Sequence, residues 1–338
     1  MKKRYLRIVA LLLLVTLVVG SFSACGKKKK EEKKTYKVAG ILNVQDMYAA
    51  LLGKTLENKA ADLNKAAGYE KYKVDIFDSE LNEQKWLTTA EDIGNSGYDY
   101  VISQTPPMDG AAGIKQITDS GAKFVHICVS GYNYMLEQNL CRVIVCNEYG
   151  LGRVVAEKAA ADLPQNAKVC VILGPLDRQS VKDRYGAIQD VFKEQRPDIE
   201  ILDTQVANWK KDEAMNKVDD WLQIYDQIDG FLAVNDAMAA GAIESLLSNN
   251  FTDWEHMFIC GVDGLTDACK YIVEGHMSCS ANQDATKYVD MFFDMIEKDI
   301  SGEDDMSKPG FYEFDPILID SNNAQSQLDF YDSLGLLK

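Results

Sequence analysis

The sequence lacks the residue patterns that most enzyme and metal sites require. Its three histidines, His126, His256 and His276, lie far apart, without an HxxxH or Cys/His spacing, so a zinc site is not expected. No GxxxxGK[ST] phosphate loop, GxSxG nucleophile turn or DxNxDG calcium loop occurs. Gly150 and Gly152 form only half of a dinucleotide fingerprint, and such a glycine pair more often serves packing. We therefore predict no cofactor, metal or catalytic residue, and an enzyme is the weaker class.

Positive charge is also scarce. The chain has 36 Lys and Arg residues against 52 Asp and Glu residues, which gives a formal net charge of −16 at pH 7. Binding to nucleic acid requires clustered cations, so nucleic acid is excluded as a partner. The negative balance suits a soluble exported protein and says nothing about the fold.

Residues 1–24 are predicted to be a lipoprotein signal peptide. Four cations precede an apolar core, Ile8–Val19, that is too short for an ordinary membrane span. The next residues, FSAC at 22–25, resemble a bacterial lipobox, which implies cleavage before Cys25 and lipid anchoring to the cell membrane on its extracytoplasmic side. Removing the four signal cations changes the net charge from −16 to −20. Residues 25–35, with KKKKEEKK, are then a lipidated tether; a plain secretory signal is the alternative.

The cysteines do not form a disulfide framework. None of the eight stands in a CxxC pair, and seven remain once Cys25 is assigned to lipid. An odd number excludes complete pairing within one chain. We expect small buried residues in or beside strands, with a bridge between Cys141 and Cys146 as an open alternative.

Beyond the tether, short apolar strands alternate with helices, and the alternation runs twice. This pattern predicts an α/β fold with parallel sheets covered by helices on both faces. Two successive runs predict two similar lobes. No linker rich in proline, glycine or serine separates them, so we expect strand-like connections.

One stretch of the second run, GFLAVNDAMAAGA at 230–242, predicts a polar position at a sheet edge. Phe231–Val234 is expected to be a buried strand, and Ala237–Leu247 a helix capped by Asp236. Asn235 lies at the carboxyl end of that strand, where ligands of open α/β sheets bind. Its amide donates and accepts, which suits a sugar hydroxyl. Taken alone, the stretch favours a second capping role for Asn235.

Several stretches together resemble the type I periplasmic sugar-binding proteins of ABC transporters, the ribose- and galactose-binding family. They are FLAVNDAMAAGA at 231–242, ICGVDG at 259–264, SANQ at 280–283, DMY at 46–48 and DRYGAI around Arg184. Their order and separations match the family over nearly the whole exported chain. The resemblance implies two Rossmann-like lobes, with a hinge of three crossovers near Cys146, Gln283 and Asp315. The lobes would comprise residues 36–146 plus 284–314 and residues 147–283 plus 315–338.

The resemblance also implies a ligand pocket. Its polar residues would hold sugar hydroxyls, and two aromatic rings would stack on the faces of the sugar. The polar residues are Asp46, Gln104, Arg184, Asn235, Asp263 and Gln283, and the aromatic residues are Tyr48 and Trp209. Charged partners form stronger hydrogen bonds to hydroxyls than neutral groups do, and flat rings bury the apolar C–H faces.

The sequence departs from the ribose-binding pattern at one point. Many ribose-type relatives carry an Asp-Arg pair after the fourth strand, where this chain has Val129 and Ser130. A ribose-like pentose is therefore disfavoured. The start at Asp46 and Tyr48, together with Trp209, is closer to the galactose- and glucose-binding branch.

We predict an extracytoplasmic, lipid-anchored solute-binding protein that captures a monosaccharide by lobe closure and delivers it to the permease of an ABC importer. A sensor that presents a sugar or furanosyl signal to a chemoreceptor or histidine kinase is the alternative, and the sequence does not separate the two. A transcription repressor would need a helix-turn-helix where the export signal stands. A hydrolase would need the missing nucleophile or metal motifs.

Overall fold

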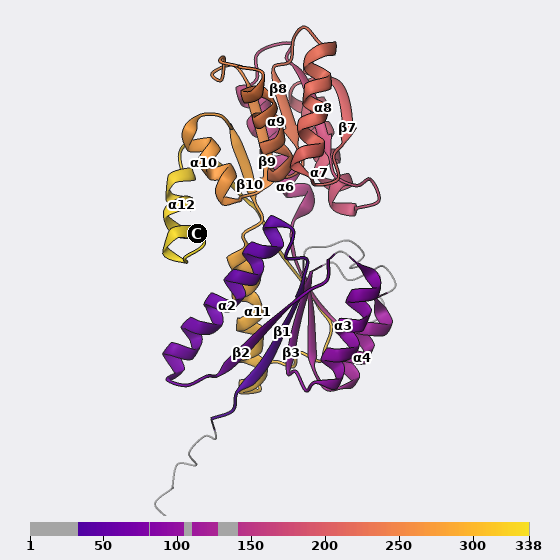
Figure 1. The fold of residues 1–338 in the computed structure, drawn as a ribbon, viewed down its shortest axis with the longest axis vertical. Coiled ribbons are helices and arrows are strands. Elements are labelled where there is room, and N and C mark those ends of the chain that lie inside the picture. The colour runs from indigo at the N-terminus through magenta and orange to yellow at the C-terminus, as the bar shows by residue number, and fades with distance from the viewer. Residues whose placement is uncertain (1–32, 81, 105–109, 128–140, 338) are drawn as a thin grey trace, which may run out of the picture. The chain divides into compact units, whose positions relative to one another are not determined.

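Two six-stranded sheets with flanking helices organise the chain (Figure 1). The computed structural model describes residues 33–80, 82–104, 110–127 and 141–337. The predicted signal peptide, Cys25 and the departure at Val129 and Ser130 lie outside the described residues. In the part of the chain that the structure describes, no helix combines the length and apolar character needed to cross a membrane.

The first sheet has the strand order β11-β5-β4-β3-β1-β2, and all its neighbouring strands are parallel. Its strands are β1 (Tyr36–Leu42), β2 (Tyr72–Asp78), β3 (Tyr100–Gln104), β4 (Lys123–Ile127), β5 (Arg142–Cys146) and β11 (Gly310–Phe314). Its helices are α2 (Met47–Ala67), α3 (Glu83–Asn95), α4 (Ala111–Asp119) and α11 (Ala285–Ser301). Helix α2 packs beside α11, and α3 packs beside α4 (Figure 1). We call this sheet with its helices the first lobe.

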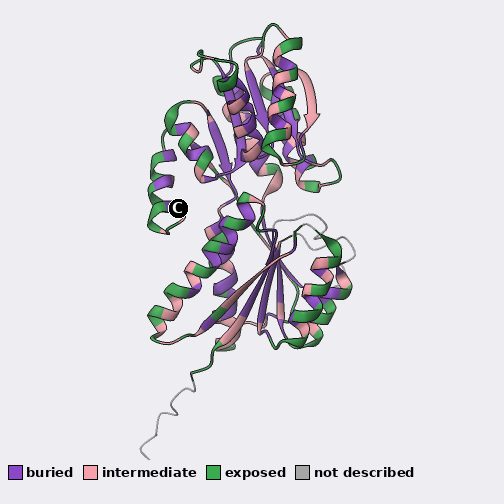
Figure 2. Ribbon diagram, in the orientation of Figure 1, coloured by how far each residue is buried: buried purple, intermediate pink, exposed green. Residues whose placement is uncertain are grey.

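Alternate residues of the strands in the first lobe face two different cores. In β1, Val38 and Leu42 belong to the same hydrophobic cluster as residues of α2. Ala39 and Ile41 belong instead to a cluster with Trp86 of α3. The period of two in a strand produces this division. Because helices cover both faces, the inner strands β1, β3, β4 and β5 are largely buried, whereas the edge strands β2 and β11 are mostly half-buried or exposed (Figure 2). This burial explains the largely apolar sequences of the inner strands.

The second sheet has the strand order β12-β10-β9-β8-β6-β7, and only the pair β10–β12 is antiparallel among the pairs described. Its strands are β6 (Lys168–Leu173), β7 (Glu200–Val206), β8 (Gly230–Ala233), β9 (Phe258–Asp263), β10 (Cys279–Asn282) and β12 (Ile317–Asp320). Its helices are α6 (Glu148–Asp162), α7 (Gln179–Gln195), α8 (Lys211–Ile224), α9 (Asp236–Ser248), α10 (Thr266–Glu274) and α12 (Ala324–Ser333). We call this sheet with its helices the second lobe.

The chain passes from one sheet to the other three times, after β5, after β10 and after β11. The first and third crossovers are joined, because the Asn147 amide donates to the Phe314 carbonyl at 2.9 Å. Helix α11 supports the first crossover, since the Cys146 amide donates to the Tyr288 hydroxyl at 2.7 Å. The predicted α/β fold, with two lobes of mostly parallel strands joined by three crossovers, is confirmed.

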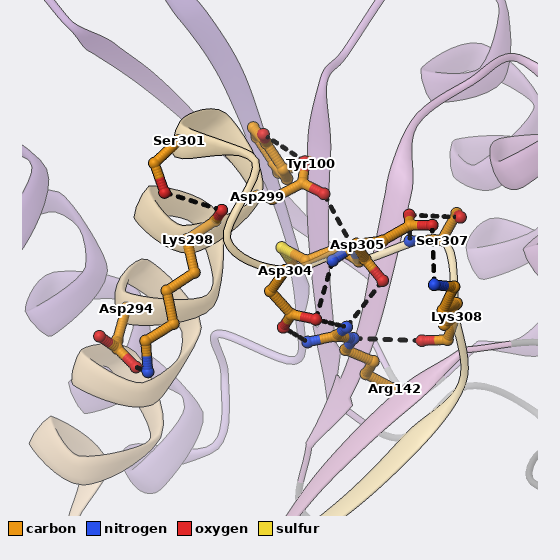
Figure 3. Close-up of polar contacts among 11 residues, drawn as sticks. Tyr100, Arg142, Asp294, Lys298, Asp299, Ser301, Asp304, Asp305, Ser307 and Lys308 are labelled. Atoms are coloured by element: carbon orange, nitrogen blue, oxygen red, sulfur yellow. Dashed lines mark hydrogen bonds and ion pairs between the residues drawn. The ribbon is translucent and has the colours of Figure 1, made fainter.

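Arg142, the first residue of β5, fixes the connection between α11 and β11 (Figure 3). Its Nη1 and Nη2 donate to the two carboxylate oxygens of Asp304 at 2.6 and 3.0 Å. Its Nε donates to the Lys308 carbonyl at 3.1 Å, and Nη2 also donates to the Asp305 carbonyl at 2.7 Å. The hydrogen bond from Arg142 lowers the pKa of Asp304 to about 2. These contacts of the Arg142 guanidinium hold the segment before β11 against β5.

The structure corrects some expectations about individual elements and residues. Strand β11 and helix α12 were not predicted. Cys141 is a free, buried thiol, so the alternative of a bridge between Cys141 and Cys146 is wrong. The prediction of small buried residues is confirmed for the described cysteines. Gly152 of α6 lies against the backbone of Arg184 in α7, where a Cβ would collide with it. The interpretation of this glycine as a packing residue is therefore correct.

Candidate functional site

Five of the predicted site residues lie at the carboxyl edge of the second sheet. Asn235 follows β8, Asp263 ends β9, and Gln283 follows β10. Trp209 lies in the loop after β7, and Arg184 reaches the same edge from α7. The carboxyl ends of parallel strands meet at one edge, so residues distant in sequence converge there.

Arg184 is the centre of this group, and it is almost completely buried. Its Nε donates to Glu148 at 2.7 Å, and its Nη1 donates to the Val234 carbonyl at 2.7 Å. The same Nη1 lies 3.9 Å from a carboxylate oxygen of Asp263. The guanidinium carbon is 5.8 Å from the centre of the Trp209 ring, within cation–π range. Arg184 thus connects a carboxylate of the first crossover with two predicted ligand residues.

Asp263 and Gln283 form a second buried pair. The Gln283 amide nitrogen donates to the Asp263 carboxylate at 2.5 Å. The amide oxygen of Gln283 is buried and has no hydrogen-bond partner among the described residues. Asp263 has a φ of 125°, a conformation that is unusual outside glycine and that occurs preferentially at functional sites. The Gln283 side-chain oxygen is therefore an acceptor whose hydrogen-bond donor is not among the described residues, and a ligand can supply that donor.

The structure confirms the capping role that the stretch alone favoured for Asn235 and corrects the one predicted for Asp236. Asn235 is the N-cap of α9, and its side-chain oxygen accepts from the Met238 amide at 2.9 Å. Asp236 lies inside the helix, and its carboxylate accepts from the Leu265 amide at 2.8 Å and from the Ser280 hydroxyl at 2.6 Å. The prediction of Asp236 as the cap is therefore wrong. Its carboxylate instead joins α9 to the turn after β9 and to β10.

Trp209 lies in a turn of unusual backbone conformation. Asn208 and Trp209 both have left-handed backbones, with φ of 49° and 64°, which is uncommon for a bulky residue. The indole lies against Gly174, the residue after β6, so closely that a Cβ on this glycine would approach the ring to 2.5 Å. Gly174 thus makes room for a partly buried ring beside Arg184.

The buried acids of this edge outnumber its cation. Burial raises the pKa of Asp263 well above its ordinary value; Arg184 opposes the shift, and Asp236 and Asp46 add to it. Burial likewise raises the pKa of Asp236 to about 6 and raises the pKa of Glu148 against the opposing charge of Arg184. Burial alone would lower the pKa of Arg184, but Glu148 and Asp263 outweigh it, and the pKa rises. Arg184 therefore keeps its charge among acids that are rich in acceptor oxygens.

Three predicted site residues belong to the first lobe. Asp46 caps α2 by accepting from the Ala49 amide at 3.0 Å, and burial raises its pKa. Its charge also acts on Asp263 of the second lobe. Gln104 ends β3, and its side-chain oxygen has no hydrogen-bond partner among the described residues. Tyr48 is 4% exposed and packs in a hydrophobic cluster, so its stacking role stays a prediction.

A family model described as periplasmic binding protein domain matches residues 44–304 of the chain. The chain belongs to this periplasmic binding protein family. Together with the relatives and solved structures that follow, this match confirms the predicted resemblance to type I periplasmic sugar-binding proteins.

Two relatives cover most of this periplasmic binding protein. A protein of Rhizobium meliloti described as a "putative rhizopine-binding protein" is 26% identical over 242 residues, which are 71% of this chain and 76% of the relative. The ribose import binding protein of Bacillus subtilis is 24% identical over 222 residues, which are 65% of this chain and 69% of the relative.

Solved structures share the fold at low identity. An ABC transporter periplasmic solute-binding protein from Actinobacillus succinogenes, with bound D-allose, has a TM-score of 0.76 and 20% identity. The match covers 87% of this chain and all of that one. A solute-binding protein from Bacillus halodurans, with bound myo-inositol, has a TM-score of 0.74 and 18% identity, covering 89% of this chain and all of that one.

Sequence reasoning missed two carboxylates of this periplasmic binding protein's site, Glu148 and Asp236. Glu148 lies in the first turn of α6 and meets Arg184, 36 residues further along the chain. An acidic residue after an Asn cap is an ordinary helix start, so no local signal distinguishes it. Among the described residues, no group of three or more His, Cys, Asp or Glu side chains is arranged to hold a metal ion.

Proposed function

We propose that this protein is an extracytoplasmic, lipid-anchored solute-binding protein that captures a monosaccharide and delivers it to an ABC importer. A hexose of the galactose or glucose type is the favoured ligand. The observation that carries the proposal is the buried edge around Arg184, with acidic residues and an amide oxygen that lacks a donor among the described residues. The protein binds its ligand and performs no chemistry on it.

The chemistry of this edge suits a hydroxyl-rich molecule. A hydroxyl donates one hydrogen bond and accepts others, so it can satisfy both a carboxylate such as Asp263 and a guanidinium such as Arg184. A buried group that requires a hydroxyl also rejects an analogue without it, because the protein partner then stays unpaired. The Trp209 ring supplies a flat apolar surface beside these polar groups.

The mechanism follows from the two lobes. We assign residues 36–146 plus 284–314 to one lobe and residues 147–283 plus 315–338 to the other, in agreement with the strand content of each sheet. A ligand held by both lobes stabilises the closed state over the open state and shifts the population toward the form that a permease recognises. Asp46, Tyr48 and Gln104 would supply the contacts from the first lobe.

Calorimetric titration with D-galactose, D-glucose, D-allose, D-ribose and myo-inositol tests the ligand class. A Kd in the micromolar range or tighter, about −8 kcal/mol, is expected for one or more hexoses. The variant Trp209→Ala should weaken that binding about 30-fold or more, as expected for a central aromatic contact.

The matched control for this test is Trp254→Ala. Trp254 is also partly buried, but it packs against Phe251 and His276 away from the carboxyl edge, with ring centres 5.3 and 4.4 Å away. This variant should bind like the wild type. The absence of heat with every compound would refute this ligand class, and an unchanged affinity in Trp209→Ala would remove Trp209 from the site.

A further inference from the structure

Asp263 and Arg184, two of the charged residues at the second-lobe edge, are each held by a side chain in or directly after a crossover. Gln283, in the second crossover, donates to Asp263. Glu148, directly after the first crossover, accepts from Arg184. The two groups with the strongest expected contacts to the ligand are therefore fixed by the segments that join the lobes.

Glu148 is well placed to control the orientation of Arg184. It is the first residue of α6, its side chain is 12% exposed, and that of Arg184 is 5% exposed. The preceding residue, Asn147, caps α6 by accepting from the Gly150 amide at 2.8 Å and donates its own amide to Phe314 of the third crossover. The carboxylate of Glu148 thus projects from a backbone that is tied to two crossovers.

We propose that Glu148 is a positioning residue, whose carboxylate holds the Arg184 guanidinium in its ligand-binding orientation and couples that orientation to the first crossover. This inference rests on the proposed function. Glu148 bonds to the arginine and is not assigned a contact with the ligand.

The hydrogen bonds that Arg184 donates explain how Glu148 orients its guanidinium. A guanidinium offers five N–H groups in a rigid plane, so fixing two of them fixes the direction of the rest. Glu148 takes Nε and the Val234 carbonyl takes an Nη1 donor. Without the charge of Glu148, the nearest remaining carboxylate is Asp263, 3.9 Å from Nη1. The arginine would then turn toward Asp263, and two ligand groups would pair with each other.

Other charged residues near Glu148 and Arg184 also influence the protonation of this pair. Asp183, on α7, raises the pKa of Glu148, whereas Arg184 lowers it against the larger effect of burial. Asp263 and Asp236 also act on this arginine from β9 and α9. Protonation of Glu148 at low pH should therefore imitate the loss of its charge by substitution.

The experiment compares Glu148→Gln with Glu157→Gln by calorimetry, using whichever of D-galactose, D-glucose, D-allose, D-ribose and myo-inositol binds the wild type. Glu157 lies on the same helix and pairs with Arg153 at 2.8 Å, but its side chain is 43% exposed. Glu148→Gln should weaken binding about 10- to 100-fold, because a buried charge loses its partner. Glu157→Gln should stay within about twofold of the wild type, as expected of a surface pair.

A pH series separates positioning from mere support of the fold. The ratio of the two affinities, wild type over Glu148→Gln, should shrink as the pH falls, because the protonated wild-type residue resembles the amide. A constant ratio, or an unchanged affinity in Glu148→Gln, overturns the proposal. If this variant does not fold, Glu148→Asp is measured instead; it keeps the charge but shortens its reach, and wild-type affinity in it overturns the proposal equally.

A ligand-free measurement keeps this test distinct from that of the proposed function. If none of the five compounds binds the wild type, a double-mutant cycle on unfolding by urea compares Glu148→Gln and Arg184→Gln with Glu157→Gln and Arg153→Gln. Stronger coupling in the Glu148–Arg184 pair supports the inference even though the ligand class has failed. Coupling no stronger than that of the surface pair overturns it.

Discussion

Arg142 and Arg184 are the two arginines that the structure buries most deeply among the described residues, and they serve different ends of the two sheets. Arg142 begins β5 at the amino edge of the first sheet, and Arg184 reaches the carboxyl edge of the second. All three nitrogens of the Arg142 guanidinium donate to the segment before β11 (Figure 3). On Arg184, Nε and Nη1 carry the described hydrogen bonds to protein atoms.

The acids beside Arg142 and Arg184 differ in their exposure to solvent and in the direction of their pKa shifts. Asp304 is 36% exposed, and its hydrogen bond with Arg142 lowers its pKa. Asp263 is buried and the Glu148 side chain is only 12% exposed beside Arg184, and this desolvation raises the pKa of both acids in spite of the arginine's charge. An arginine that donates four hydrogen bonds to one connecting segment and whose carboxylate partner reaches water is a structural clamp. An arginine with more acids around it than its single charge can compensate leaves carboxylates that a ligand can stabilise.

The largest effect should come from replacing each arginine by methionine. Arg184→Met should weaken sugar binding about 100-fold or more, because a charged donor to the ligand is lost. Arg142→Met should leave affinity unchanged and lower the free energy of unfolding by about 2–4 kcal/mol, because four partly buried hydrogen bonds disappear together. Calorimetry measures the first quantity and urea denaturation the second. If Arg142→Met kept its full stability but lost sugar binding, the distinction between a structural Arg142 and a ligand-binding Arg184 would be wrong.

A smaller effect should appear in the pH dependence of stability, with opposite signs at the two edges. The pKa of Asp236 is about 6 in the folded protein against an ordinary 3.8, so its stabilising contribution is full below pH 3.8 and is lost as the pH rises through about 6. The pKa of Asp304 is about 2, so its contribution is full above pH 3.8 and is lost as the pH falls toward 2.

Thermal unfolding from pH 2 to pH 8 measures both contributions. Asp304→Asn should flatten the acid side of the stability curve, and Asp236→Asn should flatten the decline between about pH 4 and pH 7. The Asp236 contribution is on the order of 1–3 kcal/mol, since one pKa unit corresponds to about 1.4 kcal/mol. Identical acid limbs in the wild type and Asp304→Asn would show that Arg142 does not hold this carboxylate in its charged form.

The fold was predictable because its signals are local. Strands buried on both faces have apolar sequences, and the helices between them have caps and periodic apolar faces, so alternation alone predicted the parallel sheets. The last strand and helix were missed for the opposite reason. Strand β11 has only five residues, none of them buried, and its partner β5 lies more than 160 residues earlier in the chain. In α12 only Ala324, Leu328 and Tyr331 are buried.

From the residues alone, the site was predictable at Asn235, which follows an apolar strand and was therefore placed at the carboxyl edge. Asp263, Arg184, Trp209 and Gln283 were predicted only from the resemblance to the family. Asp236 was assigned a local cap because its sequence allows one, but its partner Ser280 lies 44 residues away. Glu148 gives no local signal, since the interaction with Arg184 exists only after α6 and α7 have packed together. Pairs formed by tertiary packing are not encoded in sequence spacing.

The smallest predicted effect concerns the support of Trp209. In Gly174→Ala the new Cβ would come within 2.5 Å of the indole, so the ring must shift, and sugar affinity should fall about three- to tenfold for a displacement of this kind. Gly186→Ala is the control, because Gly186 lies in the same lobe with no atom within 4 Å of its added Cβ. That variant should bind normally and gain about 0.5–1 kcal/mol of stability from higher helix propensity. Equal affinities in the two variants would mean that the position of the ring against Gly174 does not matter for binding, and the contrast between Arg184 and Arg142 would then rest on charge alone.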